Sequence, residues 1–95
     1  MIRWTTEASS DLETIREFIA ADNPSAAARQ CDLILEAVDQ IDTFPNSGRQ
    51  SIVPKLRQLS VPHTPYIIFY RLFPNATVLI GILHGAMRRP KRLRR

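Results

Sequence analysis

The side chains that could carry chemistry lie almost entirely in the second half of the chain. They are Arg49, Lys55, Arg57, His63, Tyr66, Tyr70, Arg71, His84 and Arg88. Because His84 precedes Arg88 by four residues, the two could form an anion site, with histidine as acid, base or donor and arginine clamping a phosphate or carboxylate. The alternative is a solvent-facing histidine at the end of a strand beside a basic tail, and the spacing alone favours that alternative.

A nuclease site in this half of the chain would lack an obvious base. Metal-free RNA cleavage needs a base for the 2′-hydroxyl proton and cations that stabilise the phosphorane. Cations are abundant, but residues 43–95 contain no carboxylate. The base would therefore be His84, a lysine of lowered pKa, or an acid reaching over from the first half.

The composition excludes several other classes of site. Three glycines do not make a phosphate-binding loop, and one cysteine with two histidines is too few for a zinc site. We therefore expect no metal and no cofactor. Cys31 falls on the apolar stripe of a predicted helix and is expected in the core. Core packing is also expected for Trp4, Tyr66 and Tyr70.

The net charge of +4 conceals a division of the chain. All nine acidic residues lie between Glu7 and Asp42, so residues 1–42, with three basic residues, carry 3 − 9 = −6, and residues 43–95 carry +10. Such a division produces a directional field that steers anionic partners to one side of the molecule. For the basic residues at the C-terminus, a solvated tail that only aids solubility is the alternative.

The first half predicts one strand and two helices. Residues 2–5 alternate apolar and polar, as a strand does. Thr6 can cap a helix that ends near Asp22, and Asn23-Pro24 opens a second one. The apolar stripes of the two helices are Ala8, Leu12, Ile15 and Ile19, then Ala27, Cys31, Ile34, Leu35, Val38 and Ile41. The short connection makes the pair an antiparallel hairpin.

The second half predicts an antiparallel meander. Turn residues at 44–48 stop the second helix, and residues 56–61, 66–73 and 76–84 read as strands. The last two strands are apolar on both faces, which is typical of covered strands. The fold class is therefore α+β, with the first strand at a sheet edge and both helices packed on one sheet face. The other face needs a partner or a concave site.

The chain reads as a single domain over residues 1–88 with a basic C-terminal tail over residues 89–95. Its first residues lack the apolar core of a signal peptide, and no apolar run approaches the roughly 20 residues of a membrane span. A lone cysteine forms no internal disulfide. These features predict a cytoplasmic protein.

Several short motifs occur together at spacings typical of one family. They are Phe44-Pro45, Gly48-Arg49, Val53-Pro54, Leu56-Arg57-Gln58-Leu59, Val61-Pro62, Thr64-Pro65-Tyr66-Ile67-Ile68, Tyr70-Arg71 and Ile82-Leu83-His84-Gly85-Ala86, followed by Arg88 and Pro90. In this combination, and in the order of its expected helices and strands, the whole chain resembles the ParE/RelE superfamily of toxins from type II toxin–antitoxin modules. The Tyr-Arg and His-Gly-Ala motifs resemble the ParE branch more closely.

The resemblance implies a toxin held in a hetero-oligomeric complex by a ParD-like antitoxin, whose C-terminal segment wraps it with apolar and acidic groups. ParE-type toxins inhibit DNA gyrase and are not nucleases, whereas RelE-type toxins cleave mRNA on the ribosome. We expect gyrase inhibition. The alternatives are a ribosome-dependent, metal-free mRNA interferase with Arg57, His84 and Arg88 at the phosphate, and an inactive member that only binds its antitoxin. The residues expected to contact target or antitoxin are Arg49, Arg57, Tyr70, Arg71, His84 and Arg88.

Three departures from the family pattern count against the nuclease alternative. The usual Arg-Glu-Leu is Arg57-Gln58-Leu59 here, which removes a carboxylate. The usual aromatic-Pro after the final arginine is replaced by Arg89-Pro90. The ribosome-dependent enzymes commonly end with a tyrosine near the last strand, and no tyrosine follows Tyr70 in this chain.

Overall fold

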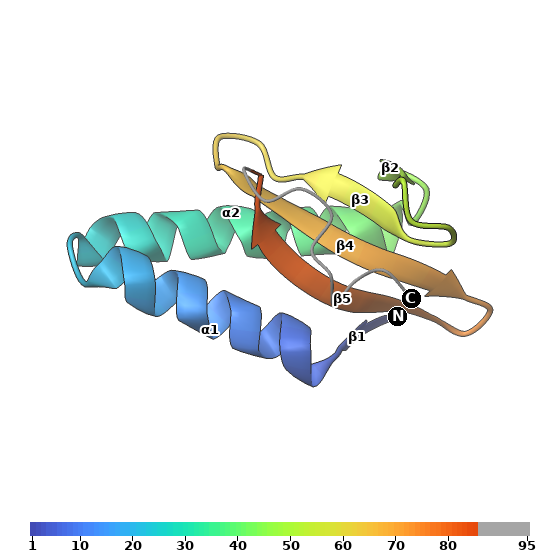
Figure 1. The fold of residues 1–95 in the computed structure, drawn as a ribbon, viewed down its shortest axis with the longest axis horizontal. Helices are drawn as coiled ribbons and strands as arrows, with labels where there is room; N and C mark the ends of the chain where they lie inside the picture. The colour runs from blue at the N-terminus through green and yellow to red at the C-terminus, as the bar shows by residue number, and fades with distance from the viewer. Residues whose placement is uncertain (86–95) are drawn as a thin grey trace.

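Two helices and five strands follow one another along residues 1–85, the part of the chain that this computed structural model describes (Figure 1). The elements are β1 (Ile2–Trp4), α1 (Thr6–Ala20), α2 (Pro24–Thr43), β2 (Arg49–Gln50), β3 (Arg57–Ser60), β4 (Tyr66–Phe73) and β5 (Ala76–His84). The predicted helices and the four predicted strands are confirmed. Arg88 and the predicted boundary between domain and tail lie outside the described residues.

Both helices begin at a polar side chain that accepts a bond from a backbone N–H group, as N-caps do. In α2 the cap is Asn23, as predicted, and its side chain accepts from the Ala26 amide at 3.0 Å. In α1 the cap is Thr5 and not Thr6, so that prediction was wrong by one residue. The Thr5 hydroxyl accepts from the Ala8 amide and also donates to the Leu79 carbonyl at 2.8 Å. It therefore joins the start of α1 to β5.

The five strands form one mixed sheet in the order β1-β5-β4-β3-β2. β1 lies at an edge, as predicted, and pairs in parallel with β5 so that Trp4 is opposite Leu79. All other pairs are antiparallel. β2, at the far edge, was not predicted, because two residues are too few to show an alternating pattern. It places Arg49 opposite Gln58.

The main core lies between the sheet and the helical hairpin, which covers one sheet face (Figure 1). Its fully buried members include Ile34 and Ile41 of α2 and Ile68, Tyr70 and Leu79 of the sheet. Two residues of the predicted apolar stripe of α2 are not fully buried in this core. The side chain of Leu35 is 42% exposed, because a helix turns by about 100° between neighbouring residues and Ile34 already faces the core. Cys31 is half-buried.

A second, smaller apolar cluster covers the sheet face that is opposite the helices. We call this the open face. Its buried members are Val53, Leu56, Phe69 and Leu83, with Ile67 and Ile80 packed against them. A register shift opposite Phe69 and Tyr70 places one extra residue, Ile80, in β5. The sheet is therefore apolar on both sides, as its sequence predicted.

Candidate partner-binding surface

Arginine side chains stand on the open face in a row that crosses three strands. Residues directly opposite each other in a sheet project to the same face. Arg3 of β1 and Arg71 of β4 both pair with Val78 of β5, one from each side. Because Ile2 and Trp4 pack into the helix-side core, Arg3 between them projects to the open face. Arg71 was a predicted site residue, and Arg3 was not.

A second row on the open face ends in another arginine. Arg49 of β2 is opposite Gln58 of β3, which is opposite Phe69 of β4. Phe69 belongs to the open-face cluster, so Gln58 and Arg49 project to that face too. Arg49 is exposed. The predicted residues Arg49 and Arg71 are therefore brought to one face, with an apolar floor between them.

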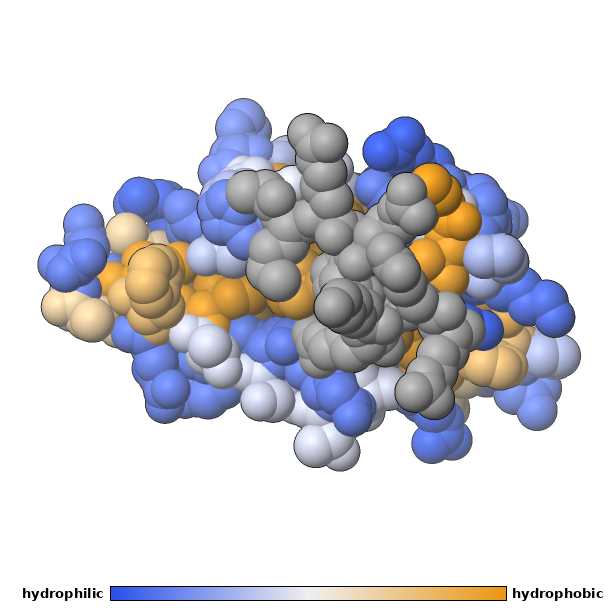
Figure 2. Space-filling model, viewed as in Figure 1, coloured by the Kyte–Doolittle hydropathy of each residue, from blue (hydrophilic) through white to orange (hydrophobic). Residues whose placement is uncertain are grey.

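The open face carries no acid among the described residues. All nine acidic residues lie on α1, on α2 or in the turn between them, and the hairpin covers the opposite side of the sheet. Gln58 matters here, since the family's usual glutamate at this position would add a carboxylate between Arg49 and Phe69. Figure 2 looks onto the open face and shows hydrophobic surface to the right of the grey atoms, near β2 and β3.

Arg57 points away from the open face and holds a loop. It is opposite Tyr70, whose side chain lies in the helix-side core. Its Nε donates to the Gly48 carbonyl at 3.0 Å and its Nη2 donates to the Asn46 carbonyl at 3.4 Å. The structure thus gives the guanidinium of Arg57 two backbone partners in the segment after α2.

Tyr70 packs in the helix-side core. Its side chain is 0% exposed, so it offers no surface to a partner. The hydroxyl donates to the Pro45 carbonyl at 2.7 Å and accepts from the Gly48 amide at 2.9 Å. The expectation that Tyr70 packs in the core is confirmed. Its predicted place among the residues that contact target or antitoxin stays a prediction, and the burial of its side chain argues against it.

His84 and Arg57 lie at different levels of the sheet. His84 is exposed, pairs with Tyr66 at the start of β4, and meets the Tyr66 ring edge-on with 5.7 Å between ring centroids. Arg57 pairs with Tyr70, four residues further along β4. At about 3.3 Å per residue these two levels are roughly 13 Å apart. The described structure does not bring His84 and Arg57 together.

One acid does reach from the helices to the sheet. Asp11 of α1 accepts a hydrogen bond from the Ile82 amide of β5 at 2.9 Å. β1 pairs only with residues 77–79 of β5, so Ile82 lies beyond the end of that pairing. Asp11 therefore takes the place of a strand neighbour at this edge. The sequence contained no local signal for it, because the two residues are 71 positions apart.

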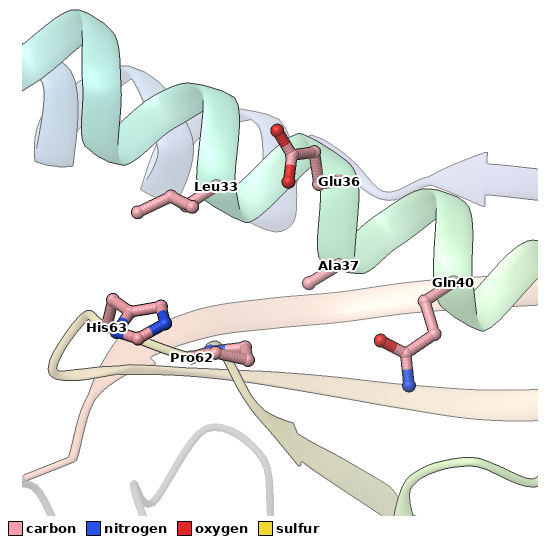
Figure 3. A pocket seen from close by; sticks show the side chains of 6 residues that line it. All are labelled: Leu33, Glu36, Ala37, Gln40, Pro62 and His63. Carbon is pink, nitrogen blue, oxygen red and sulfur yellow. The ribbon is translucent and has the colours of Figure 1, made fainter.

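A small hollow lies on the helix side, between α2 and the turn that joins β3 to β4 (Figure 3). It has a volume of about 250 Å³ and is lined by Leu33, Glu36, Ala37, Gln40, Pro62 and His63. Figure 3 shows the Gln40 side chain extending from α2 toward the strands and Glu36 pointing away from them. No residue of the open face takes part. Within residues 1–85, no group of three His, Cys, Asp or Glu could hold a metal ion.

Comparison with known proteins identifies the family. Residues 2–89 match the family described as the ParE toxin of the type II toxin-antitoxin system parDE. The chain belongs to the ParE toxin family. It is 37% identical over 90 residues to the Y4kP protein of Sinorhizobium fredii (strain NBRC 101917 / NGR234), covering 95% of this chain and 93% of the relative. It is also 34% identical to Toxin RelE3 of Caulobacter vibrioides (strain ATCC 19089 / CIP 103742 / CB 15), covering 86% and 90%.

The fold of this ParE-family toxin is shared with a solved structure. The structure titled "Chromosomal ParDE TA system from P. aeruginosa" superimposes with a TM-score of 0.80 at 26% identity and covers 87% of this chain and 92% of that one. The predicted superfamily is thus confirmed, and family membership implies an antitoxin partner. None of the described helices is long and apolar enough to cross a membrane.

Proposed function

We propose that this toxin inhibits DNA gyrase without catalysing a reaction and is silenced by a ParD-like antitoxin that covers the open face. The observation that carries the proposal is the match to the ParE family over residues 2–89. The placement of Arg57 and His84 at different levels of the sheet supports it, since the base and the cation of a phosphate site must both reach the reacting atoms of one nucleotide.

The open face suits an antitoxin segment with apolar and acidic side chains. Its floor, formed by Phe69, Leu83 and their neighbours, is apolar. Arg3, Arg49 and Arg71 stand on the same face. The three arginines would set the register of an acidic segment and speed its association. The acidic hairpin on the other side of the sheet would repel the same segment.

A supercoiling assay with purified gyrase tests the proposal. The toxin, released from its complex with antitoxin, should block supercoiling of relaxed plasmid, and a stoichiometric amount of antitoxin should restore it. Supercoiling that proceeds normally in an excess of active toxin would refute gyrase as the target.

A second candidate function is cleavage of mRNA on the ribosome. It is favoured by relatives named Toxin RelE2 and Toxin RelE3 of Caulobacter vibrioides, which are 31% and 34% identical to this chain. Toeprinting on translating ribosomes separates the two candidates. New cleavage ends at the ribosomal A site that disappear on addition of antitoxin would support the interferase, and an unchanged toeprint would exclude it.

A further inference from the structure

The chain between α2 and β3 is held in one conformation by side chains from elsewhere in the fold. We call residues 44–56 the edge segment, because β2 within it forms the edge of the sheet. Its first part is fixed by Tyr70, which bonds Pro45 and Gly48, and by Arg57, which bonds Asn46 and Gly48. The buried hydroxyl of Tyr70 and the guanidinium of Arg57 therefore both bond to backbone groups of one loop.

The second part of the edge segment is equally well anchored. The Gln50 side chain donates to the carbonyls of Val53 and Leu56 at 3.0 and 3.1 Å. The Ser51 amide donates to the Leu56 carbonyl at 2.7 Å. Val53 and Leu56 are buried in the open-face cluster. The segment therefore has little freedom left to lose when a partner binds it.

Two large apolar side chains on this rigid segment face solvent. Phe44 is 64% exposed at the end of α2, and Ile52 is 69% exposed just after β2. The charged residues of the segment, Arg49 and Lys55, are both basic. In Figure 1 the segment projects at the upper right beyond β3, and Figure 2 shows hydrophobic surface there.

The shape of this surface distinguishes it from the open face. An antitoxin segment that becomes ordered on binding needs a floor to lie on, which the open face supplies. Phe44 and Ile52 instead extend outward from a pre-organised loop. Projecting anchors of this kind fit pockets of a partner that is already folded, and aromatic anchors dominate the affinity of such interfaces. Arg49 projects to the open face, and the other basic residue of the segment, the exposed Lys55, favours a partner with carboxylates around its pocket.

We propose that the edge segment contacts the cellular target of the toxin through Phe44 and Ile52, and that the antitoxin does not need these two side chains. The target surface should be a folded protein with an apolar recess and an acidic rim. This inference rests on the proposed function in one respect, which is that the toxin acts by binding a macromolecular target.

The test separates toxicity from antitoxin binding in the full-length chain. Phe44→Ala and Ile52→Ala are compared with Phe18→Ala, a matched control whose phenyl ring is 75% exposed on α1. Each variant is expressed from a titratable promoter, and its affinity is measured for antitoxin purified from the co-expressed complex. We expect Phe44→Ala and Ile52→Ala to need about tenfold more toxin for growth arrest, as for a hot spot. Phe18→Ala should match wild type, and antitoxin affinity should change less than about threefold in all three.

Each outcome decides the inference. Growth arrest by Phe44→Ala at wild-type levels overturns it, and so does a parallel fall in antitoxin affinity, which would make the edge segment an antitoxin site. Phe44→Leu, which keeps an apolar anchor, should retain most of the toxicity and shows that a loss in Phe44→Ala does not come from misfolding. If wild type arrests growth but gyrase is unaffected in vitro, the gyrase proposal fails. The edge-segment inference is then still decided by how strongly the Phe44 and Ile52 variants arrest growth. If wild type itself causes no arrest, both fail.

Discussion

The hydroxyl of Tyr70 lies 2.9 Å from the amide nitrogen of Gly48, although 22 residues separate them. A Cβ atom added at Gly48 would meet that hydroxyl at 2.5 Å and the Gln58 carbonyl oxygen at 2.7 Å. The glycine is therefore required by close approach, since its backbone does not have a positive φ. This contact ties the loop after α2 to the centre of the sheet.

Gly48→Ala should destabilise the fold. The added methyl has no free space, so Tyr70 or the β3 backbone must move, and overpacking of this kind costs about 1–3 kcal/mol. Urea unfolding followed by circular dichroism measures the change. Ser47→Ala, at the exposed neighbouring position, is the control and should stay within about 0.5 kcal/mol of wild type.

Tyr70→Phe should also lower stability, by a different route. Removal of the hydroxyl leaves the Gly48 amide and the Pro45 carbonyl without this partner, at a cost of about 1–3 kcal/mol. The two substitutions should not be fully additive, because loss of the hydroxyl also removes the nearest of the atoms with which the new methyl would collide. A double-mutant cycle checks this, and strict additivity would contradict the contact.

Asp11→Ala should weaken the attachment of α1 to the sheet. The Ile82 amide then loses its acceptor at an edge that β1 does not cover, and we expect a loss of about 1–2 kcal/mol in the free energy of unfolding. Asp11→Asn keeps an oxygen acceptor and should cost less. Asp32→Ala removes an exposed acid from α2 and serves as the control. Equal effects of the three substitutions would rule out a specific role for the bond.

Arg49→Glu should weaken antitoxin binding if the open face is the docking surface. The substitution places a carboxylate on a face that otherwise carries none in the described chain. We expect a loss of about tenfold or more at low salt, which shrinks as salt screens the charge. Isothermal titration calorimetry at two salt concentrations measures it. Arg29→Glu makes the same change on α2 and should leave affinity unaltered.

Cys31 should react slowly while the protein is folded. Burial raises the pKa of its thiol, an effect that the nearby Arg16 partly offsets. The folded thiol therefore stays protonated to higher pH than the unfolded one, and less thiolate is available for reaction. The associated stability is present below the unfolded pKa and is lost as the pH rises through the folded pKa. Reaction with a disulfide reagent near pH 8 should be slower than in urea, and equal rates would contradict the burial.

The arrangement of helices and long strands was predictable because it depends on patterns that repeat along the chain. The stripes of α1 and α2 and the bounds of β4 and β5 followed from spacing and turn residues. β2 was missed because two residues carry no period. Leu35 was wrongly assigned to the core-facing stripe of α2, because an apolar residue beside the stripe looks in the sequence like one of its members.

The candidate site was less predictable, because its members meet only through pairing of distant strands. Arg3 lies in the acidic half of the sequence, yet the parallel pairing of β1 with β5 places it in the same row as Arg71. Arg57 and Tyr70 belong to the expected motifs, but their hydrogen bonds show that they hold the edge segment in place. The sequence therefore pointed to important residues, but it did not show which of them contact a partner and which hold the fold in place.

The position of β5 between β1 and β4 also affects when this protein can become harmful. β5 is the last strand of the described chain to be synthesised, yet it contacts α1 and pairs with both the earliest strand and β4. A nascent chain that lacks it has an incomplete sheet, and its helices have no finished surface to pack on. Translation thus imposes a delay, and we expect a growing polypeptide to stay inactive until β5 has been made. Antitoxin already present in the cell could then meet each new molecule as its sheet closes.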